Sequence, residues 1–360
     1  MNQHYVPRVY LKNFAEARGS EYFVDVFNKN TKAFFPTNIK KICAGKDFYT
    51  LDDNEDATKD TLAIEKLYAK GFEPMYERAY RILIDDLITN ISDLQRSEIL
   101  LATFQLYIRN PRILNLSIQT HQFKIDQLCK QAKISGTKGI TYLNEDFPFS
   151  EWSKDAIITY FTEKTTTYFK EQHIGGIREM GTFHEFAKFE VTKTVGESFY
   201  FTSDNPMVVE DLINPDEHPF VRSNEFILTL NPQYSVRIFH DNKIGLNTIT
   251  RTISPMGNTG SRNHTVYAQA QRFVIGSRKH IEDFFKISNF LDDTSLKPKI
   301  EAMRQIVAKF EINPENAGMH ALFKEYLQKY DEKDSLTFDE EQDFLRRLKA
   351  LTMNWKQGRM

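Results

Sequence analysis

The chain has 360 residues, of which 41% are hydrophobic and 27% are charged, and its net charge is −2. This length and balance are those of a globular protein built as one large domain, or as one domain with an appendage. They exclude a global basic field that would recruit nucleic acid, and no run of residues approaches the roughly 18 apolar residues that a membrane span needs.

The N-terminal stretch MNQHYVPRVYLKNF lacks the basic start and the apolar run of a signal peptide. The only two cysteines, Cys43 and Cys129, are too few for a structural zinc site or a disulfide framework. Both observations favour a reducing, cytoplasmic setting. The first predicted elements are a β-hairpin at 21–35 and a short extended segment at 46–51, followed by an acidic loop at 52–56.

Helices are predicted next, from about residue 58 to residue 180. Apolar residues recur at helical spacing over 62–87, and Gly71 and Pro74 predict a break into two helices. A further pair of helices is predicted at 113–132 and 152–170, with a loop at 134–150 between them.

The helix that begins near residue 92 has clear signals at both ends. Ser92-x-x-Gln95 is a capping-box pattern, in which each side chain satisfies a free backbone N–H group. Asn110-Pro111 predicts that this helix bends or ends there, because proline disfavours a helical residue before it and removes a hydrogen bond.

The second half of the chain changes character. Segments rich in β-branched and aromatic residues predict strands at 183–192, 197–203, 225–230, 234–240 and 265–276. From about residue 280 the pattern returns to amphipathic helix, for example at 338–351. The order predicts an α+β fold: a largely antiparallel sheet packed with a helical subdomain and C-terminal helices. Residues 1–280 form the predicted main domain (helical part about 58–180, sheet part about 183–276), and 281–360 form a C-terminal helical extension.

Four segments carry a family resemblance. The opening HYVPRVYLKNF, from His4 to Phe14, resembles the signature of a bacterial family known as domain of unknown function 4238. Three later segments are similar to that family in the same order: Gln105-x-x-x-Arg109-Asn110-Pro111-Arg112, the turn Thr202-Ser203-Asp204-Asn205-Pro206, and Asn263 followed by a strand at Ala268 and Ala270. The resemblance covers about residues 1–280. It implies no particular reaction, because no activity is attached to the family.

His4 is the first candidate catalytic residue. An imidazole can act as a general acid or base near neutral pH or ligate a metal, and Tyr5 and Tyr10 could orient it. The alternative interpretation is that the segment is pinned into the core, where His4 would make structural hydrogen bonds.

Gln105, Arg109 and Arg112 stand at positions i, i+4 and i+7, so a continuous helix would present all three on one face. Paired guanidinium groups can grip a phosphate or a carboxylate. The alternative is that the arginines bridge acidic residues such as Glu65 or Glu73. Arg109 is the stronger candidate, because Pro111 is expected to turn Arg112 away.

Asp204-Asn205-Pro206 follows an apolar strand, and strand ends often carry catalytic carboxylates. Asp204 is a candidate magnesium ligand or water activator, and Asn205 a candidate for orienting the ligand. Glu73, together with Glu65, could complete an acidic metal cluster. The alternatives are an ordinary Asp-Asn-Pro turn and surface salt bridges.

Taken together, these residues predict a phosphodiester-cleaving hydrolase or nuclease. His4 would be its acid or base, Arg109 its phosphate clamp and Asp204 its metal ligand, with Glu73 as a second metal ligand. The predicted substrate-binding residues are Tyr5, Tyr10, Gln105, Arg112, Asn205 and Asn263. An effector of phage defence or a toxin is the expected setting, inferred from how orphan bacterial families are often used.

Two rival interpretations stay open. In the first, the chain is a non-catalytic module that binds a nucleotide, a nucleic acid or a protein, with the C-terminal helices as its interaction surface. In the second, the motifs determine the fold. The sequence has no P-loop, GxGxxG, GxSxG or HExxH motif, which argues against the enzyme classes that those motifs mark.

Overall fold

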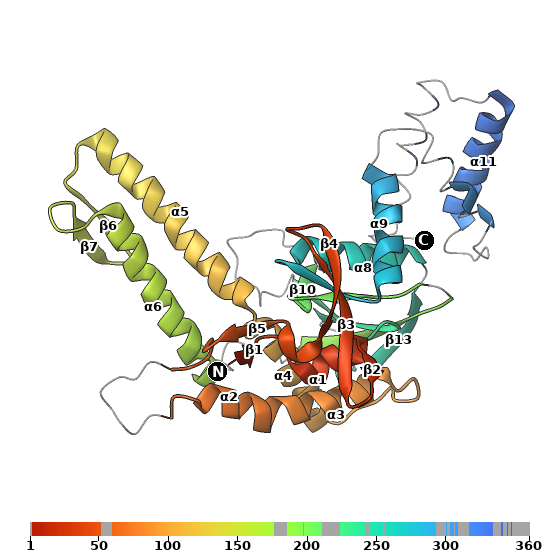
Figure 1. Ribbon diagram of the computed structural model, residues 1–360, viewed down its shortest axis with the longest axis horizontal. Helices are drawn as coiled ribbons and strands as arrows, with labels where there is room; N and C mark the ends of the chain where they lie inside the picture. Colours follow the sequence, from red (N-terminus) through yellow and green to blue (C-terminus); the bar gives the residue numbers. More distant parts are fainter. Residues whose placement is uncertain are drawn as a thin grey trace.

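The computed structural model describes residues 2–51, 60–175, 186–196, 198–210, 224–241, 245–254, 256–292 and 317–333, with shorter pieces at 300, 303–305, 307–308, 340, 344 and 347. It is an α+β protein with antiparallel sheets and C-terminal helices, which confirms the predicted fold class (Figure 1). The acidic loop predicted at 52–56, the start of the strand predicted at 183–192 and nearly all of the helix predicted at 338–351 lie outside the described residues.

The first sheet has five strands in the order β10-β11-β12-β8-β13. Neighbours are antiparallel except that β13 runs parallel to β8. The strands are β8 (Ala187–Thr194), β10 (Met207–Glu210), β11 (Glu225–Thr229), β12 (Tyr234–His240) and β13 (Ile249–Ser254). In β11, Phe226 and Leu228 pack into the main core while Ile227 packs into a second cluster. This part of the sheet is therefore covered on both faces, as the continuous apolar run in β11 suggests.

The second sheet pairs strands from residues 16–38 with strands from residues 202–276. Its order is β2-β3-β14-β9, with β4 on β3. The strands are β2 (Glu16–Arg18), β3 (Glu21–Asn28), β4 (Ala33–Asn38), β9 (Thr202–Ser203) and β14 (Phe273–Gly276). The hairpin predicted at 21–35 is confirmed by the β3–β4 pair.

A separate two-stranded ribbon holds the N-terminus. β1 (Asn2–His4) pairs antiparallel with β5 (Ala44–Lys46), and His4 lies opposite Ala44. The extended segment predicted at 46–51 is wrong beyond Lys46, because the chain turns there with Asp47 in the left-handed region at φ 51°.

The helices predicted between residues 58 and 180 follow the predicted order with two local differences, whereas the helices at 8–11 and 256–269 were not predicted. They are α1 (Arg8–Leu11), α2 (Ala63–Leu67), α3 (Glu73–Ile84), α4 (Asp93–Ile108), α5 (Pro111–Ser135), α6 (Lys154–Gly175), α8 (Met256–Gln269), α9 (Arg278–Asp292) and α11 (Ala317–Lys333). The break expected at Gly71 is a π-helical turn over Tyr68–Phe72 that leaves α2 and α3 continuous. The loop predicted at 134–150 contains a hairpin, β6 (Gly139–Tyr142) with β7 (Glu145–Pro148).

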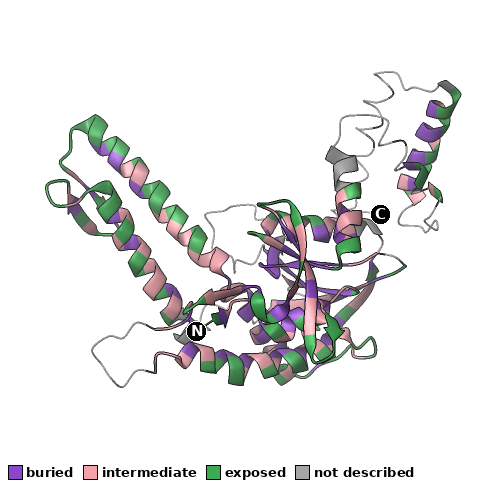
Figure 2. Cartoon of the chain, viewed as in Figure 1, coloured by how far each residue is buried: buried purple, intermediate pink, exposed green. Residues whose placement is uncertain are grey.

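α5 and α6 form an arm that projects from the sheets and carries the β6–β7 hairpin at its far end (Figure 1). Figure 2 shows many exposed positions along both helices of the arm, and buried positions concentrated in the sheets. α11 packs against Ile300, Met303 and Phe344 in a small core of its own. No helix in the described part of the chain is both long enough and apolar enough to cross a membrane.

The strand predicted over 265–276 is wrong in its first half. Residues up to Gln269 belong to α8, and only Phe273–Gly276 form a strand, so Ala268 is helical. Val266 and Ala270, four residues apart, both pack into the second cluster. That spacing is helical, but a run of mixed β-branched and aromatic residues conceals it.

The capping box at the start of α4 is confirmed. Ser92 Oγ accepts a hydrogen bond from the Gln95 N–H at 3.2 Å, and Gln95 Oε1 accepts one from the Ser92 N–H at 2.9 Å. We expect Ser92→Ala to lower the free energy of unfolding by about 1 kcal/mol in urea titration. Ser97→Ala is the control, because it removes a mid-helix bond to the Asp93 carbonyl and should change stability by less than about 0.5 kcal/mol. Equal losses would mean that the capping box adds nothing.

Candidate functional site

The junction between α4 and α5 separates the predicted arginine pair. α4 ends at Ile108 with Arg109 as its C-cap, and Asn110 caps α5 by accepting a hydrogen bond from the Arg112 N–H at 2.8 Å. Gln105 and Arg109 therefore belong to one helix and Arg112 to the next, so the prediction of a single face is wrong. The Arg112 guanidinium donates instead to the Gln269 carbonyl at 2.7 Å.

The Asp204 carboxylate accepts hydrogen bonds from three consecutive backbone N–H groups. Its Oδ1 accepts a hydrogen bond from Gln271 N at 2.9 Å, and its Oδ2 accepts from Arg272 N at 2.7 Å and from Phe273 N at 3.0 Å. The side chain of Asn110 donates to the Asp204 carbonyl at 2.7 Å. Burial raises the pKa of Asp204, although the three amides favour the ionised form and oppose part of that rise.

Other predicted site residues also make structural hydrogen bonds. We call Asp204, Asn205, Asn263 and Tyr10 the structural clamp. Asn205 Nδ2 donates to the Gln269 carbonyl at 3.2 Å, and Asn263 Nδ2 donates to the Phe199 carbonyl at 2.9 Å. The Tyr10 hydroxyl donates to the Thr229 carbonyl at 2.8 Å and lies 2.6 Å from Thr202 Oγ1. These bonds tie α1, α8 and the two sheets together, so the geometry of this group favours the interpretation that its members determine the fold.

The predicted magnesium ligands lie in different surroundings. Asp204 is 4% exposed and bonded to backbone amides, whereas Glu73 is half-buried at the start of α3 beside Glu65. Within the described ranges, no group of three or more His, Cys, Asp and Glu side chains is placed to hold a metal ion. A site built on Asp204 and Glu73 would therefore lack a third protein ligand of these types there.

Arg109 is the centre of a second, contrasting group. Its side chain is buried, with its guanidinium carbon 4.0 Å from the centroid of the Tyr68 ring and 5.7 Å from that of Tyr49. Arg109 Nη2 donates to the His4 carbonyl, and the Tyr49 hydroxyl donates to the Arg109 carbonyl at 2.5 Å. The π-helical turn after α2 and the β1–β5 ribbon thus hold one cation in an aromatic setting.

His4 carries a half-buried imidazole at the end of β1. Burial lowers the pKa of its imidazole, and the charges of Arg8 and Arg109 lower it further, while bonds to the backbone of Ile39 and Lys40 oppose part of the shift. The imidazole is therefore neutral at pH 7. Its buried Nε2 has no hydrogen-bond partner among the described residues, and in the tautomer protonated on Nδ1 this nitrogen presents a free lone pair.

His173 supplies a donor from α6. Its Nδ1 lies 2.6 Å from the Tyr68 hydroxyl. Burial raises the pKa of Tyr68, and burial together with the charge of Arg109 lowers the pKa of His173 to about 3, so both groups are neutral at pH 7. When the Tyr68 hydroxyl donates to Nδ1, the His173 proton is on Nε2, which has no hydrogen-bond partner in the described part of the chain.

We call His4, Glu65, Gln105, Arg109 and His173 the Arg109 centre. Each has one buried polar atom without a hydrogen-bond partner among the residues that the structure describes: His4 Nε2, Glu65 Oε2, Gln105 Oε1, Arg109 Nε and His173 Nε2. The Arg109 charge acts on His4, Glu65 and His173, and Gln105 lies one turn earlier in α4. Each such atom costs about 1–3 kcal/mol when unsatisfied, so this group is suited to bind water or another polar ligand.

The sequence predicted His4, Gln105 and Arg109 as site residues, but it gave no reason to add His173. No local pattern marks His173, because α6 brings it to the centre only in the folded chain. From the sequence, Glu65 was considered as a metal ligand together with Glu73. In the structure, burial raises its pKa, the charge of Arg109 lowers it and that of Glu73 raises it.

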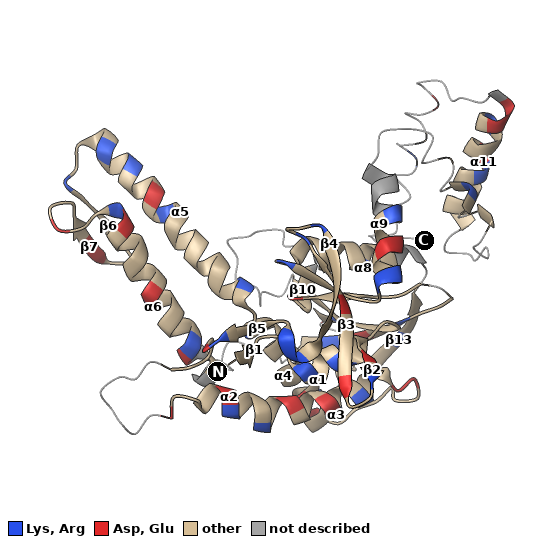
Figure 3. Cartoon of the chain, viewed as in Figure 1, with Lys and Arg blue, Asp and Glu red and all other residues tan. Residues whose placement is uncertain are grey.

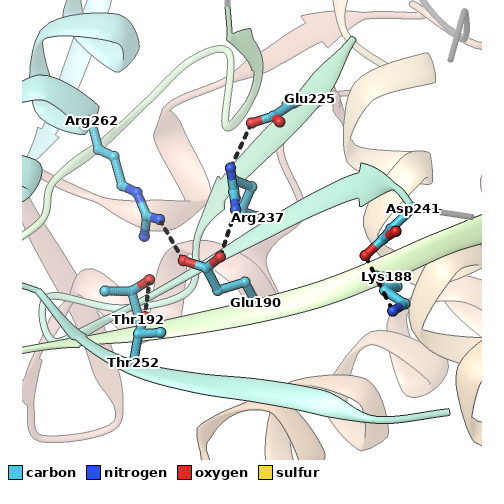
Figure 4. Close-up of polar contacts among 8 residues, drawn as sticks. All are labelled: Lys188, Glu190, Thr192, Glu225, Arg237, Asp241, Thr252 and Arg262. Carbon is cyan, nitrogen blue, oxygen red and sulfur yellow. Dashed lines mark hydrogen bonds and ion pairs between the residues drawn. The ribbon is translucent and has the colours of Figure 1, made fainter. Parts of the chain in front are cut away.

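A third polar group lies on the first sheet (Figure 4). Arg237 lies between Glu190, at 2.6 Å, and Glu225, at 2.9 Å, and Arg262 is 3.8 Å from Glu190. Lys188 is paired with Asp241 at 3.3 Å. Here each cation faces a carboxylate, so the charges balance, and this group is a weaker candidate for a ligand site than the Arg109 centre.

The chain was compared with known proteins. The family described as "Protein of unknown function (DUF4238)" matches residues 2–280, from β1 to the start of α9. No curated protein and no solved structure matches the chain.

Proposed function

Because the chain belongs to the DUF4238 family, whose description assigns no reaction, we propose from its own geometry that the Arg109 centre is the active site of a phosphodiester-cleaving hydrolase. The substrate would be a nucleotide or a nucleic acid. A single observation carries the proposal: a neutral imidazole with a free Nε2 lies beside a buried guanidinium with an unpartnered Nε among the described residues.

The donors and acceptors divide by role. Arg109 Nε–H and His173 Nε2–H would bind the anionic phosphate oxygens and the charge that grows on them in the transition state. His4 Nε2 would take a proton from a water molecule, and Glu65 would help to orient that water. The water oxygen forms a bond to phosphorus, the bond to the leaving oxygen breaks, and that oxygen takes a proton from solvent. His4 then returns its proton to solvent.

Arg8 extends the site toward solvent. It is exposed at the start of α1, and its charge acts on both His4 and Glu65. Elsewhere basic and acidic residues are interspersed, for example along α3 and α9 (Figure 3). Attraction of a polyanion would therefore depend on local groups such as Arg8 and not on the field of the whole protein.

The pH dependence of cleavage tests the role of His4. Because burial lowers its pKa below 6.5, kcat/KM should rise as the pH rises through that lowered pKa and stay flat above it. His4→Gln should reduce the rate about 10²–10⁴-fold and abolish the rise. The measurement uses bis(p-nitrophenyl) phosphate and oligonucleotides, with and without magnesium.

His264→Gln is the matched control, because His264 is an exposed histidine on α8. It should leave both the rate and the profile unchanged. A rate that falls over the same pH range would make His4 an acid and contradict the assignment. Phosphate-dependent binding without turnover would favour the non-catalytic module.

The cellular setting is part of the proposal. A cytoplasmic effector that cleaves nucleic acid or a nucleotide during phage infection fits the proposed chemistry. Plaque counts on cells that express the wild-type chain or His4→Gln would show whether protection follows the catalytic histidine.

A further inference from the structure

A pocket of about 420 Å³ lies beside the N-terminal segment, and its lining residues include no member of the Arg109 centre. The β4 strand, the residues before β5 and the turn between α8 and β14 form its walls. His4 and Tyr5 are adjacent in the chain, yet His4 belongs to the Arg109 centre and Tyr5 lines this pocket. The volume lies within the roughly 300–1,000 Å³ that small-molecule sites occupy.

The interior favours a planar group. Phe35 and Phe273 line the pocket with their ring centroids 6.1 Å apart at an interplanar angle of 76°, and both are half-buried. Tyr5 is a third aromatic residue of the lining. Aromatic walls of this kind stack on the faces of heterocyclic bases.

A carboxylate at the same pocket selects for a hydrogen-bond donor. Asp204 lines the pocket, and its Oδ1 accepts one hydrogen bond, from Gln271 N. A carboxylate oxygen can accept about two hydrogen bonds. An exocyclic amino group of a base would supply the second one, whereas a keto oxygen at that position would be repelled.

Two cations stand among the lining residues. Lys41 and Arg272 are exposed, and neither forms an ion pair with another residue in the described ranges. Arg272 is held over the Phe273 ring, with its guanidinium carbon 4.7 Å from the centroid. Exposed cations next to an aromatic pocket suit a phosphate that stays near solvent while the base enters.

We propose that this pocket binds a free nucleoside monophosphate whose base carries an exocyclic amino group, with the base against the aromatic rings and the phosphate on Lys41 and Arg272. The site is separate from the Arg109 centre and requires no turnover. It would let the protein sense a nucleotide while the Arg109 centre acts on a substrate.

Calorimetric titration of the full chain with AMP, GMP and CMP tests this proposal, with IMP as the ligand that lacks the amino group of AMP. We expect at least one of the three to bind, and we expect AMP to bind at least tenfold more tightly than IMP. Lys41→Glu should weaken binding by about tenfold or more. Lys40→Glu is the matched control, because the adjacent Lys40 is also exposed but pairs with Glu21 at 3.6 Å, outside the pocket.

The proposal is overturned if none of the three nucleotides binds, if AMP and IMP bind alike, or if Lys40→Glu and Lys41→Glu weaken binding equally. Binding is measured without turnover, so its failure is distinct from a failure to cleave phosphodiesters.

Discussion

Replacing Arg109 with lysine is expected to reduce kcat/KM for phosphodiester cleavage by about 10²–10³. Lysine keeps the positive charge but loses the Nε–H donor and the planar face that lies 4.0 Å from the Tyr68 centroid. An ammonium group cannot reproduce that stacked, forked geometry, so the substitution is not conservative here. The loss should appear mainly in kcat if Arg109 binds charge that develops in the transition state.

Arg96→Lys is the matched control for this experiment. Arg96 lies in the same helix, is buried, and donates to the Ala187 carbonyl at 2.8 Å. Its replacement should lower the melting temperature and leave kcat/KM per folded molecule unchanged. If Arg109→Lys behaves like Arg96→Lys, with a loss of stability only, then Arg109 is a structural cation and the proposed function fails.

Asp204→Ala should lower the free energy of unfolding by about 3–5 kcal/mol. The substitution leaves three backbone N–H groups, those of Gln271, Arg272 and Phe273, without their acceptor. Those bonds hold the turn between α8 and β14, on which the pairing of β14 with β3 and β9 depends. Urea titration followed by circular dichroism measures the loss, and the m-value shows whether unfolding stays two-state.

Asp25→Ala provides the comparison for Asp204→Ala. The Asp25 carboxylate accepts one hydrogen bond, from the Arg278 N–H at 3.0 Å at the exposed start of α9. Its loss should cost about 1 kcal/mol. Equal costs at the two positions, with activity lost only in Asp204→Ala, would return Asp204 to the active site and contradict its role as a structural clamp.

The motif residues show which features could be predicted from a few neighbouring residues and which could not. Asn110-Pro111 predicted the end of α4, and both the helix end and the cap of α5 are found there. The same dipeptide made the expected face of Gln105, Arg109 and Arg112 impossible, because that face required one unbroken helix. Asp204 carried the signals of both a turn and a catalytic carboxylate, and residue type alone could not separate them.

The sequence by itself determined the α+β class, the hairpin at 21–35, the capping box at Ser92 and the membership of residues 2–280 in one family. These depend on periodicity, on turn chemistry and on interactions within a few residues. Only the tertiary structure decided which polar groups are satisfied, because their partners lie far away in the chain. His173 reaches Tyr68 across 105 positions, whereas Asp204 meets its amides 67 to 69 residues later. The contrast between the Asp204 carboxylate, which accepts hydrogen bonds from three backbone amides, and the under-bonded Arg109 centre therefore exists only in the folded chain.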